Sequence, residues 1–234
     1  EIYRTDILPY HVVDEVRDSW RKELYELFAP VVDTCRTMEE ALCAVNSRIP
    51  LLTGVEYNTL REKTNQSPRE SMRQGMASCT GLSILLVDAL RSVGIPARFV
   101  GTASWHDNRG NHSWTEVWLD SAWRVTEYYF PSQLDHLWFM DDAAKANPAD
   151  RQYAIYATRF GKSDDWFPMV WCGEDSTAVE DLPQTIGAEN VTQHYINLAQ
   201  SQRRQRIENG THTELRIAGY ARREATTHSS DRVA

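Results

Sequence analysis

The sequence lacks the features that mark several large classes of protein. It has 234 residues and a formal net charge of -8, and so acidic a chain is poorly suited to binding nucleic acid or an anionic membrane as its main role. No apolar run approaches the roughly 20 residues of a membrane-spanning helix. No internal repeat is present, so the chain is expected to form ordinary globular structure.

Cysteine is also scarce: there are four residues and no CxxC pair, which leaves a zinc ribbon or a thioredoxin motif unsupported. A polar loop with His106, Asp107 and the nearby His112 offers metal ligands, but their spacing fits no standard site. We therefore expect no metal and no cofactor. The compartment of this soluble chain stays open, and a secreted or periplasmic location would require that an upstream signal has been removed.

The remaining composition is that of a globular domain, with 41% hydrophobic and 25% charged residues. Residues 1–198 are expected to form one domain with N-terminal helices, and 199–234 a linker and a disordered tail. Apolar spacing and capping signals predict helices and then strands. The helices are expected over 10–28, 37–49, 67–74 and 80–92, and the strands over 97–102, 112–119, 122–129, 153–157 and 167–171.

One cysteine has the surroundings of a nucleophile. Cys79 lies among small residues in the segment 74–81, directly before the apolar helix over 80–92. The start of a helix presents unpaired amides and a positive dipole end, which lower the pKa of a thiol and can also bind an oxyanion. The alternative is a buried structural cysteine, which is the commoner role of a free thiol.

A histidine and a carboxylate follow on two strands. If residues 120–121 form a two-residue turn, Trp118 lies opposite Trp123 and Glu127 becomes a diagonal neighbour of His112 on the same face. A slip of one residue would move Glu127 to the other face. The sequence thus predicts a thiol, an imidazole base and a carboxylate that orients it.

Four further residues are candidates for supporting roles. Gln66 and Gln74 are predicted as second oxyanion donors beside the Cys79 amide, and Trp114 as a side chain that lines the acyl cleft. Glu116, on the strand of the histidine, is an alternative orienter.

These segments resemble the transglutaminase-like superfamily of papain-type cysteine enzymes. The resemblance covers roughly residues 68–130 and rests on Cys79–Gly81, Leu90–Arg98, His112–Val117 and Trp123–Glu127. It implies an α+β fold, with a papain-like transglutaminase core in which the cysteine-bearing helix packs on an antiparallel sheet. The family's usual aspartate is Glu127 here, and its usual alanine after the histidine is a serine.

The resemblance implies cysteine-dependent acyl transfer through a thioester. We expect hydrolysis of a peptide or amide bond, with a peptide, a protein or a small amide as substrate. An amide-forming, transglutaminase-type acyltransferase is the first alternative. A catalytically inactive binding or scaffold module is the alternative of another class, and the eight tryptophans favour it. The oligomeric state stays open.

Overall fold

The computed structural model describes residues 1–131, 134–174 and 177–210. The chain divides into two compact units, Glu1–Gln200 and Ser201–Ala234. The second unit is described only as far as residue 210, where it contains the end of a helix, so most of the predicted tail lies outside the described residues. Among the described helices, none has the length and apolar character needed to span a bilayer.

The first unit combines helices with two sheets. Its helical segments, together with the helix that runs into the second unit, are η1 (Tyr3–Ile7), α1 (Trp20–Val32), α2 (Met38–Thr53), α3 (Pro68–Gln74), α4 (Cys79–Ser92), α5 (Met140–Ala143), η2 (Val170–Cys172), η3 (Val179–Asp181) and α6 (Thr192–Glu208). Its strands are β1 (Glu56–Tyr57), β2 (Met76–Ala77), β3 (Ala97–Thr102), β4 (His112–Leu119), β5 (Ala122–Thr126), β6 (Ile155–Thr158), β7 (Asp165–Trp166) and β8 (Gly187–Asn190).

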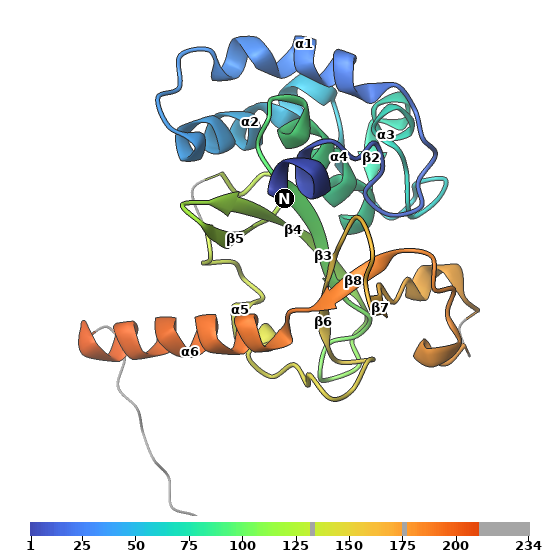
Figure 1. Ribbon diagram of the computed structural model, residues 1–234, viewed down its shortest axis with the longest axis vertical. Helices are drawn as coiled ribbons and strands as arrows, with labels where there is room; N and C mark the ends of the chain where they lie inside the picture. The colour runs from blue at the N-terminus through green and yellow to red at the C-terminus, as the bar shows by residue number, and fades with distance from the viewer. Residues whose placement is uncertain (132–133, 175–176, 211–234) are drawn as a thin grey trace, which may run out of the picture. The chain divides into compact units, whose positions relative to one another are not determined.

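The larger sheet has the order β5-β4-β3-β6-β8-β7, and all of its pairings are antiparallel. Helix α4 packs on β3 and β4 with one face and on α1 with another (Figure 1). Leu85, Leu86 and Leu90 of α4 are fully buried in the core that results. The predicted α+β fold, with the cysteine-bearing helix packed on an antiparallel sheet, is confirmed.

Local signals place the start of two helices as predicted. The Thr37 hydroxyl accepts from the Glu40 amide at the start of α2. Ser67 and Glu70 form a complete capping box at the start of α3, and Pro68 occupies the first helical position. Helix α3 then stops at Gly75, whose φ of +66° suits a residue without a side chain.

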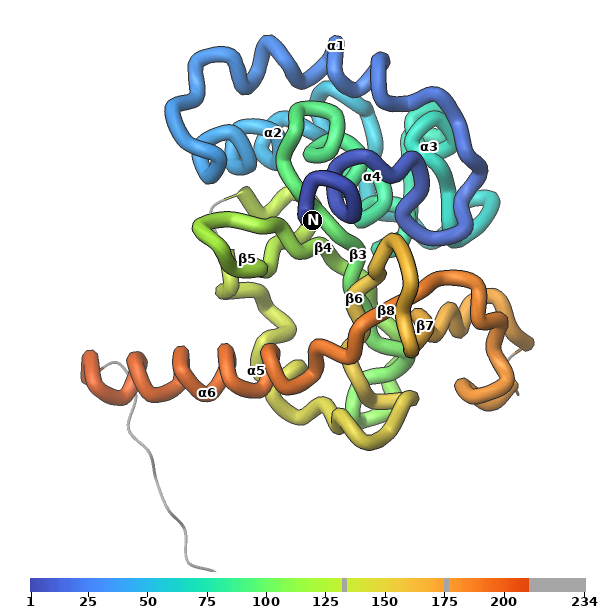
Figure 2. Tube along the Cα trace, in the orientation of Figure 1, coloured from blue at the N-terminus to red at the C-terminus, as the bar shows by residue number. Residues whose placement is uncertain are grey.

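The N-terminal region differs from the prediction. Residues 10–19 form bends and irregular chain, and helix α1 begins only at Trp20. The Glu15 carboxylate accepts from the backbone amides of Val12 and Val13, at 2.6 and 2.8 Å, in place of helical carbonyls. Figure 2 shows this segment passing beside α4 before the chain enters α1.

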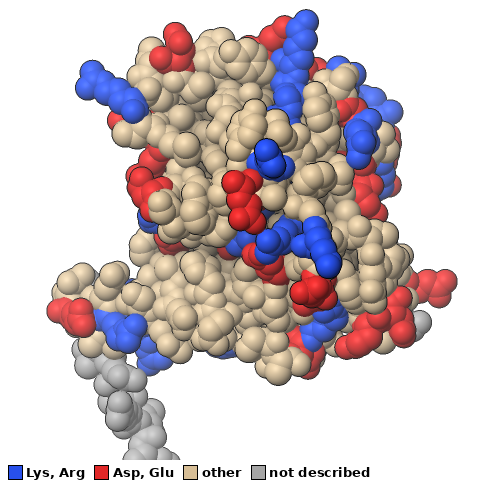
Figure 3. All heavy atoms as spheres, viewed as in Figure 1, with Lys and Arg blue, Asp and Glu red and all other residues tan. Residues whose placement is uncertain are grey.

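The later part of the chain differs too. Residues 167–171, predicted as a strand, include the start of η2, and the neighbouring strand is the two-residue β7. Residues 199–208, the first part of the predicted linker, continue helix α6. On the face of the molecule in Figure 3, basic and acidic side chains are interspersed, with no large area of one sign.

Candidate active site

Cys79 is the first residue of α4. Ser78 before it is extended, and the first helical bond runs from the Leu82 amide to the Ser78 carbonyl at 2.9 Å. The amides of the helix's first turn therefore have no carbonyl within the helix, and they point where an anion would be stabilised.

A glycine makes this turn possible. A Cβ at Gly81 would lie 2.8 Å from the Cβ of Ala77. Such a contact is shorter than two carbon atoms tolerate, so a side chain at residue 81 would push the segment before Cys79 away from the helix.

The β4–β5 hairpin brings the base and the acid together. Asp120 and Ser121 form the predicted two-residue turn with φ of 48° and 64°, and Trp118 pairs with Trp123. In this register His112 Nε2 lies 2.8 Å from Glu127 Oε1. The other ring nitrogen, Nδ1, remains for the hydrogen bond between His112 and Cys79.

The thiol and the imidazole shift each other's pKa. Burial disfavours the Cys79 thiolate, but the hydrogen bond and charge of His112 outweigh it, with help from the Ser113 amide and the Thr80 hydroxyl, so the pKa of Cys79 is lowered. Burial likewise disfavours the cationic imidazole, yet Cys79 and Glu127 raise the pKa of His112 to about 9. Both shifts act in the same sense, because each favours the thiolate–imidazolium pair over the neutral pair.

Two residues that the sequence did not single out hold Glu127 in place. Trp138 Nε1 donates to Glu127 Oε2 at 2.9 Å, and the Trp138 ring lies 5.2 Å from the His112 ring. Asn46, fully buried in α2, donates to the Glu127 carbonyl at 2.9 Å and accepts from the Tyr129 amide at 2.6 Å. Asn46 reaches Glu127 from 81 residues away in the chain, and Trp138 from the irregular segment after β5, so no regular pattern reveals either.

A cleft of about 350 Å³ opens beside the three residues. Besides Cys79, His112 and Glu127 themselves, its wall is mainly apolar or aromatic, with Tyr57, Leu82, Tyr128, Phe130 and Trp138. No lysine or arginine is among the described residues that line it. Thus the thiol faces a space that an uncharged apolar group would fill.

Comparison with protein-family models identifies the family of the segment that contains Cys79, His112 and Glu127. Residues 26–128, a little under half of the chain, match the model of the transglutaminase-like superfamily. The predicted resemblance is confirmed for this segment. A search of curated proteins finds no match.

Two solved structures are similar over part of this chain. A proposed cysteine protease from Cytophaga hutchinsonii is 17% identical with a TM-score of 0.43, over 54% of this chain and 43% of that one. A TGase is 13% identical with a TM-score of 0.34, over 50% of this chain and 34% of that one. The chain thus spans less than half the length of either structure.

The two glutamines predicted as oxyanion donors have their amide groups engaged elsewhere in the transglutaminase-like segment. Gln66 is fully buried and donates to the Ser71 hydroxyl at 3.2 Å and the Met76 carbonyl at 2.9 Å. Gln74 donates to the Glu70 carbonyl at 3.2 Å. As placed, neither amide is directed at the cleft, and the first-turn amides of α4 remain the candidates for binding an oxyanion.

Trp114 lies behind the site and not along its cleft. It is fully buried, stacks on Trp105 with ring centroids 6.0 Å apart, and lies 5.7 Å from the His112 ring. Its indole donates to the Tyr195 hydroxyl at 2.7 Å. The prediction that it lines the acyl cleft is therefore not met, because the side chain packs into the core on the other side of the imidazole.

Glu116, the alternative orienter, has other partners. Its carboxylate accepts from Arg98 Nε at 2.7 Å and from the Tyr195 hydroxyl at 2.7 Å. His106 of the alternative metal site lies 3.3 Å from Asp142, and no cluster of three potential ligands occurs within the described ranges. The imidazole at residue 112 is therefore left to Cys79 and Glu127.

Proposed function

We propose that this chain is a cysteine-dependent acyl-transfer enzyme that hydrolyses a peptide or amide bond through a thioester. The observation that carries the proposal is the hydrogen-bonded series Cys79–His112–Glu127 at the wall of an open cleft. In this proposal Cys79 is the nucleophile, His112 the acid and base, and Glu127 the group that orients the imidazole.

The proposed first step is attack of the Cys79 thiolate on the substrate carbonyl carbon. The carbonyl π electrons move to the oxygen, and the amides at the start of α4 donate to the oxyanion. As the C–N bond breaks, the His112 imidazolium gives its proton to the leaving amine. His112, now neutral, takes a proton from water, which attacks the thioester and releases the acid and the thiolate.

The cleft supports a preference for an uncharged, apolar acyl group. Tyr57, Leu82 and Phe130 supply apolar surface beside the thiol. The charge of Glu127 is taken up by His112 and the Trp138 indole. A lysine or glutamate side chain on the substrate would lose water there without gaining a partner of opposite charge.

The test uses peptide amides that release a fluorophore and differ only in phenylalanine, lysine or glutamate before the scissile bond. We expect the phenylalanine substrate to be cleaved fastest, and mass spectrometry to find the acyl group on Cys79. Cys79→Ala should abolish turnover, while Cys172→Ala, which changes an exposed thiol, should leave it unchanged. Turnover that persists in Cys79→Ala would refute the proposal.

Adding an amine such as a lysine ester separates hydrolysis from amide formation. If water is the acceptor, the amine changes neither the products nor their ratio. If amide product predominates, the transglutaminase-type alternative replaces hydrolysis. If Cys79 is neither acylated nor selectively alkylated, the chain is a binding module that keeps the fold without the chemistry.

A further inference from the structure

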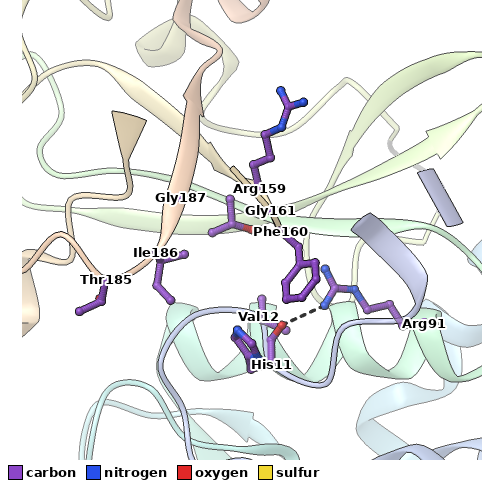
Figure 4. A pocket seen from close by; sticks show the side chains of 10 residues that line it. His11, Val12, Arg91, Arg159, Phe160, Gly161, Thr185, Ile186 and Gly187 are labelled. Carbon is purple, nitrogen blue, oxygen red and sulfur yellow. Dashed lines mark hydrogen bonds between the residues drawn. The ribbon is translucent and has the colours of Figure 1, made fainter. Parts of the chain in front are cut away.

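A second cavity, of about 200 Å³, lies beside the end of α4 that is remote from Cys79. Figure 4 shows the guanidinium of Arg91 beside the Phe160 ring and bonded to the His11 carbonyl, and the His11 ring lies 5.8 Å from the Phe160 ring. With about 1.5 Å of rise per residue, Arg91 is about 18 Å along the helix from Cys79. The cavity is thus separate from the proposed active site.

Arg91 brings a buried charge to this cavity. The residue is 3% exposed, and its side chain donates only to backbone carbonyls: Nε to those of Asp6 and Ala97 at 3.0 Å each, and Nη1 to that of His11 at 3.2 Å. Nη2 has no hydrogen-bond partner among the described residues, and no described carboxylate forms an ion pair with Arg91. A buried guanidinium is ordinarily paired with an anion.

Three acidic residues act on Arg91 without contacting it. Burial raises the pKa of Asp6 and of Glu15, and raises that of Asp88 well above its usual value. Glu15 is occupied by two backbone amides, as described above, and Asp6 accepts from the adjacent threonine hydroxyl at 2.6 Å. The carboxyl oxygens of Asp88 have no hydrogen-bond partner. The buried carboxyl groups therefore leave the cation at the cavity wall without a direct counter-ion.

The charged residues that shift the pKa of His11 are both arginines. Burial lowers the pKa of His11, and so do Arg17, whose Nη2 lies 3.2 Å from His11 Nδ1, and Arg91. Arg159, although it lines the cavity, points away from it in Figure 4 and pairs with Glu189 and Glu1. Among the described residues, Arg91 Nη2 and the second ring nitrogen of His11, Nε2, are thus left without a hydrogen-bond partner beside the cavity.

We propose that this cavity binds a small oxyanion, a carboxylate or a phosphate, through Arg91 Nη2 and the ring of His11. Charge-assisted hydrogen bonds from a guanidinium are well suited to both anions. Val12, Phe160 and Ile186 add apolar surface to a wall that also includes Thr158 and Thr185, and the volume of about 200 Å³ limits the ligand to a compact group. The proposal is independent of the chemistry at Cys79.

The test follows the His11 ring by NMR during pH titrations of the whole chain, in phosphate, in acetate and in chloride at equal ionic strength. We expect phosphate or acetate to raise the pKa of His11 saturably, because a bound anion favours the imidazolium, while chloride does not. The anion that acts identifies the ligand class. His136, an exposed histidine outside the cavity, should show no such shift and is the internal control.

Two variants make the result specific. Arg91→Gln should abolish the anion effect, and Ile186→Trp, which fills the cavity without removing a buried charge, provides the same test if Arg91→Gln does not fold. A pKa of His11 that responds equally to all three salts would overturn the proposal. An anion effect that survives Ile186→Trp would also overturn it. The same holds if the anion protects Cys79 from alkylation, because the anion would then lie in the active-site cleft.

Discussion

The thiolate at Cys79 depends on His112, and this dependence can be measured as a rate of alkylation. Burial alone would raise the pKa of Cys79, and the hydrogen bond and charge of His112 reverse that effect. We therefore expect His112→Gln to turn a fast-labelling thiol into a slow one. Cys172, whose pKa is raised to about 11, is an internal reference in the same molecule.

The expected difference follows from the fraction of thiolate. At pH 7 a thiol with a pKa of about 11 is roughly 0.01% ionised, whereas one with a pKa below the ordinary 9.0 is more than roughly 1% ionised. The ratio is at least about 100, and the lower nucleophilicity of the less basic thiolate reduces it by about tenfold. Cys79 should thus react with iodoacetamide at least about ten times faster than Cys172.

Mass spectrometry of peptides labelled for increasing times gives both rates from one sample. In His112→Gln the advantage of Cys79 at pH 7 should disappear, while the rate at Cys172 should not change. Circular dichroism of the variant establishes that the fold is retained. Equal rates at the two cysteines in the unaltered chain, or a fast Cys79 in the folded variant, would refute the assigned role of His112.

Three other predictions concern groups around the imidazole. Glu127→Gln should lower turnover by about 100-fold or more, which is a smaller loss than that expected for Cys79→Ala. It should also move the alkaline limb of the pH–rate profile below about 9, because Glu127 helps to raise the pKa of His112. An unmoved limb would exclude this role. Trp138→Phe keeps a ring beside His112 but removes one hydrogen bond to Glu127, so kcat should fall by about fivefold with little change in KM. Gly101→Ala would place a Cβ 2.7 Å from the His112 carbonyl oxygen, and urea denaturation should show a loss of about 1–3 kcal/mol in the free energy of unfolding.

Local chemistry explains which parts of the structure could be predicted from sequence. The register of β4 and β5 follows from a two-residue turn and an alternating pattern, and this register sets the distance between His112 and Glu127. The start of α4 at Cys79 follows from small residues before a leucine-rich helical face. These features depend on neighbours within about 20 residues of chain.

The missed features depend on contacts between distant segments. Asn46 reaches Glu127 from α2, and only the packed fold shows that its amide lies beside that carbonyl. The Gln66 amide donates to the nearby Ser71 hydroxyl and Met76 carbonyl. The separation of Gln66 from Cys79 in the sequence does not reveal these bonds. Val12 and Val16 have helical spacing, but the Glu15 carboxylate supplies the local backbone with an alternative to helical bonds.

The two-residue turn between β4 and β5 also has a consequence for folding kinetics. It joins His112 and Glu127 across a separation of only 15 residues, so the entropy cost of closing this loop is small. The hydrogen bonds from Asn46 to Thr126 and to the Glu127 carbonyl, by contrast, span 80 and 81 residues. We therefore expect the base and its acid to meet early as a local hairpin, and α2 to fix Glu127 only when the distant parts of the chain condense.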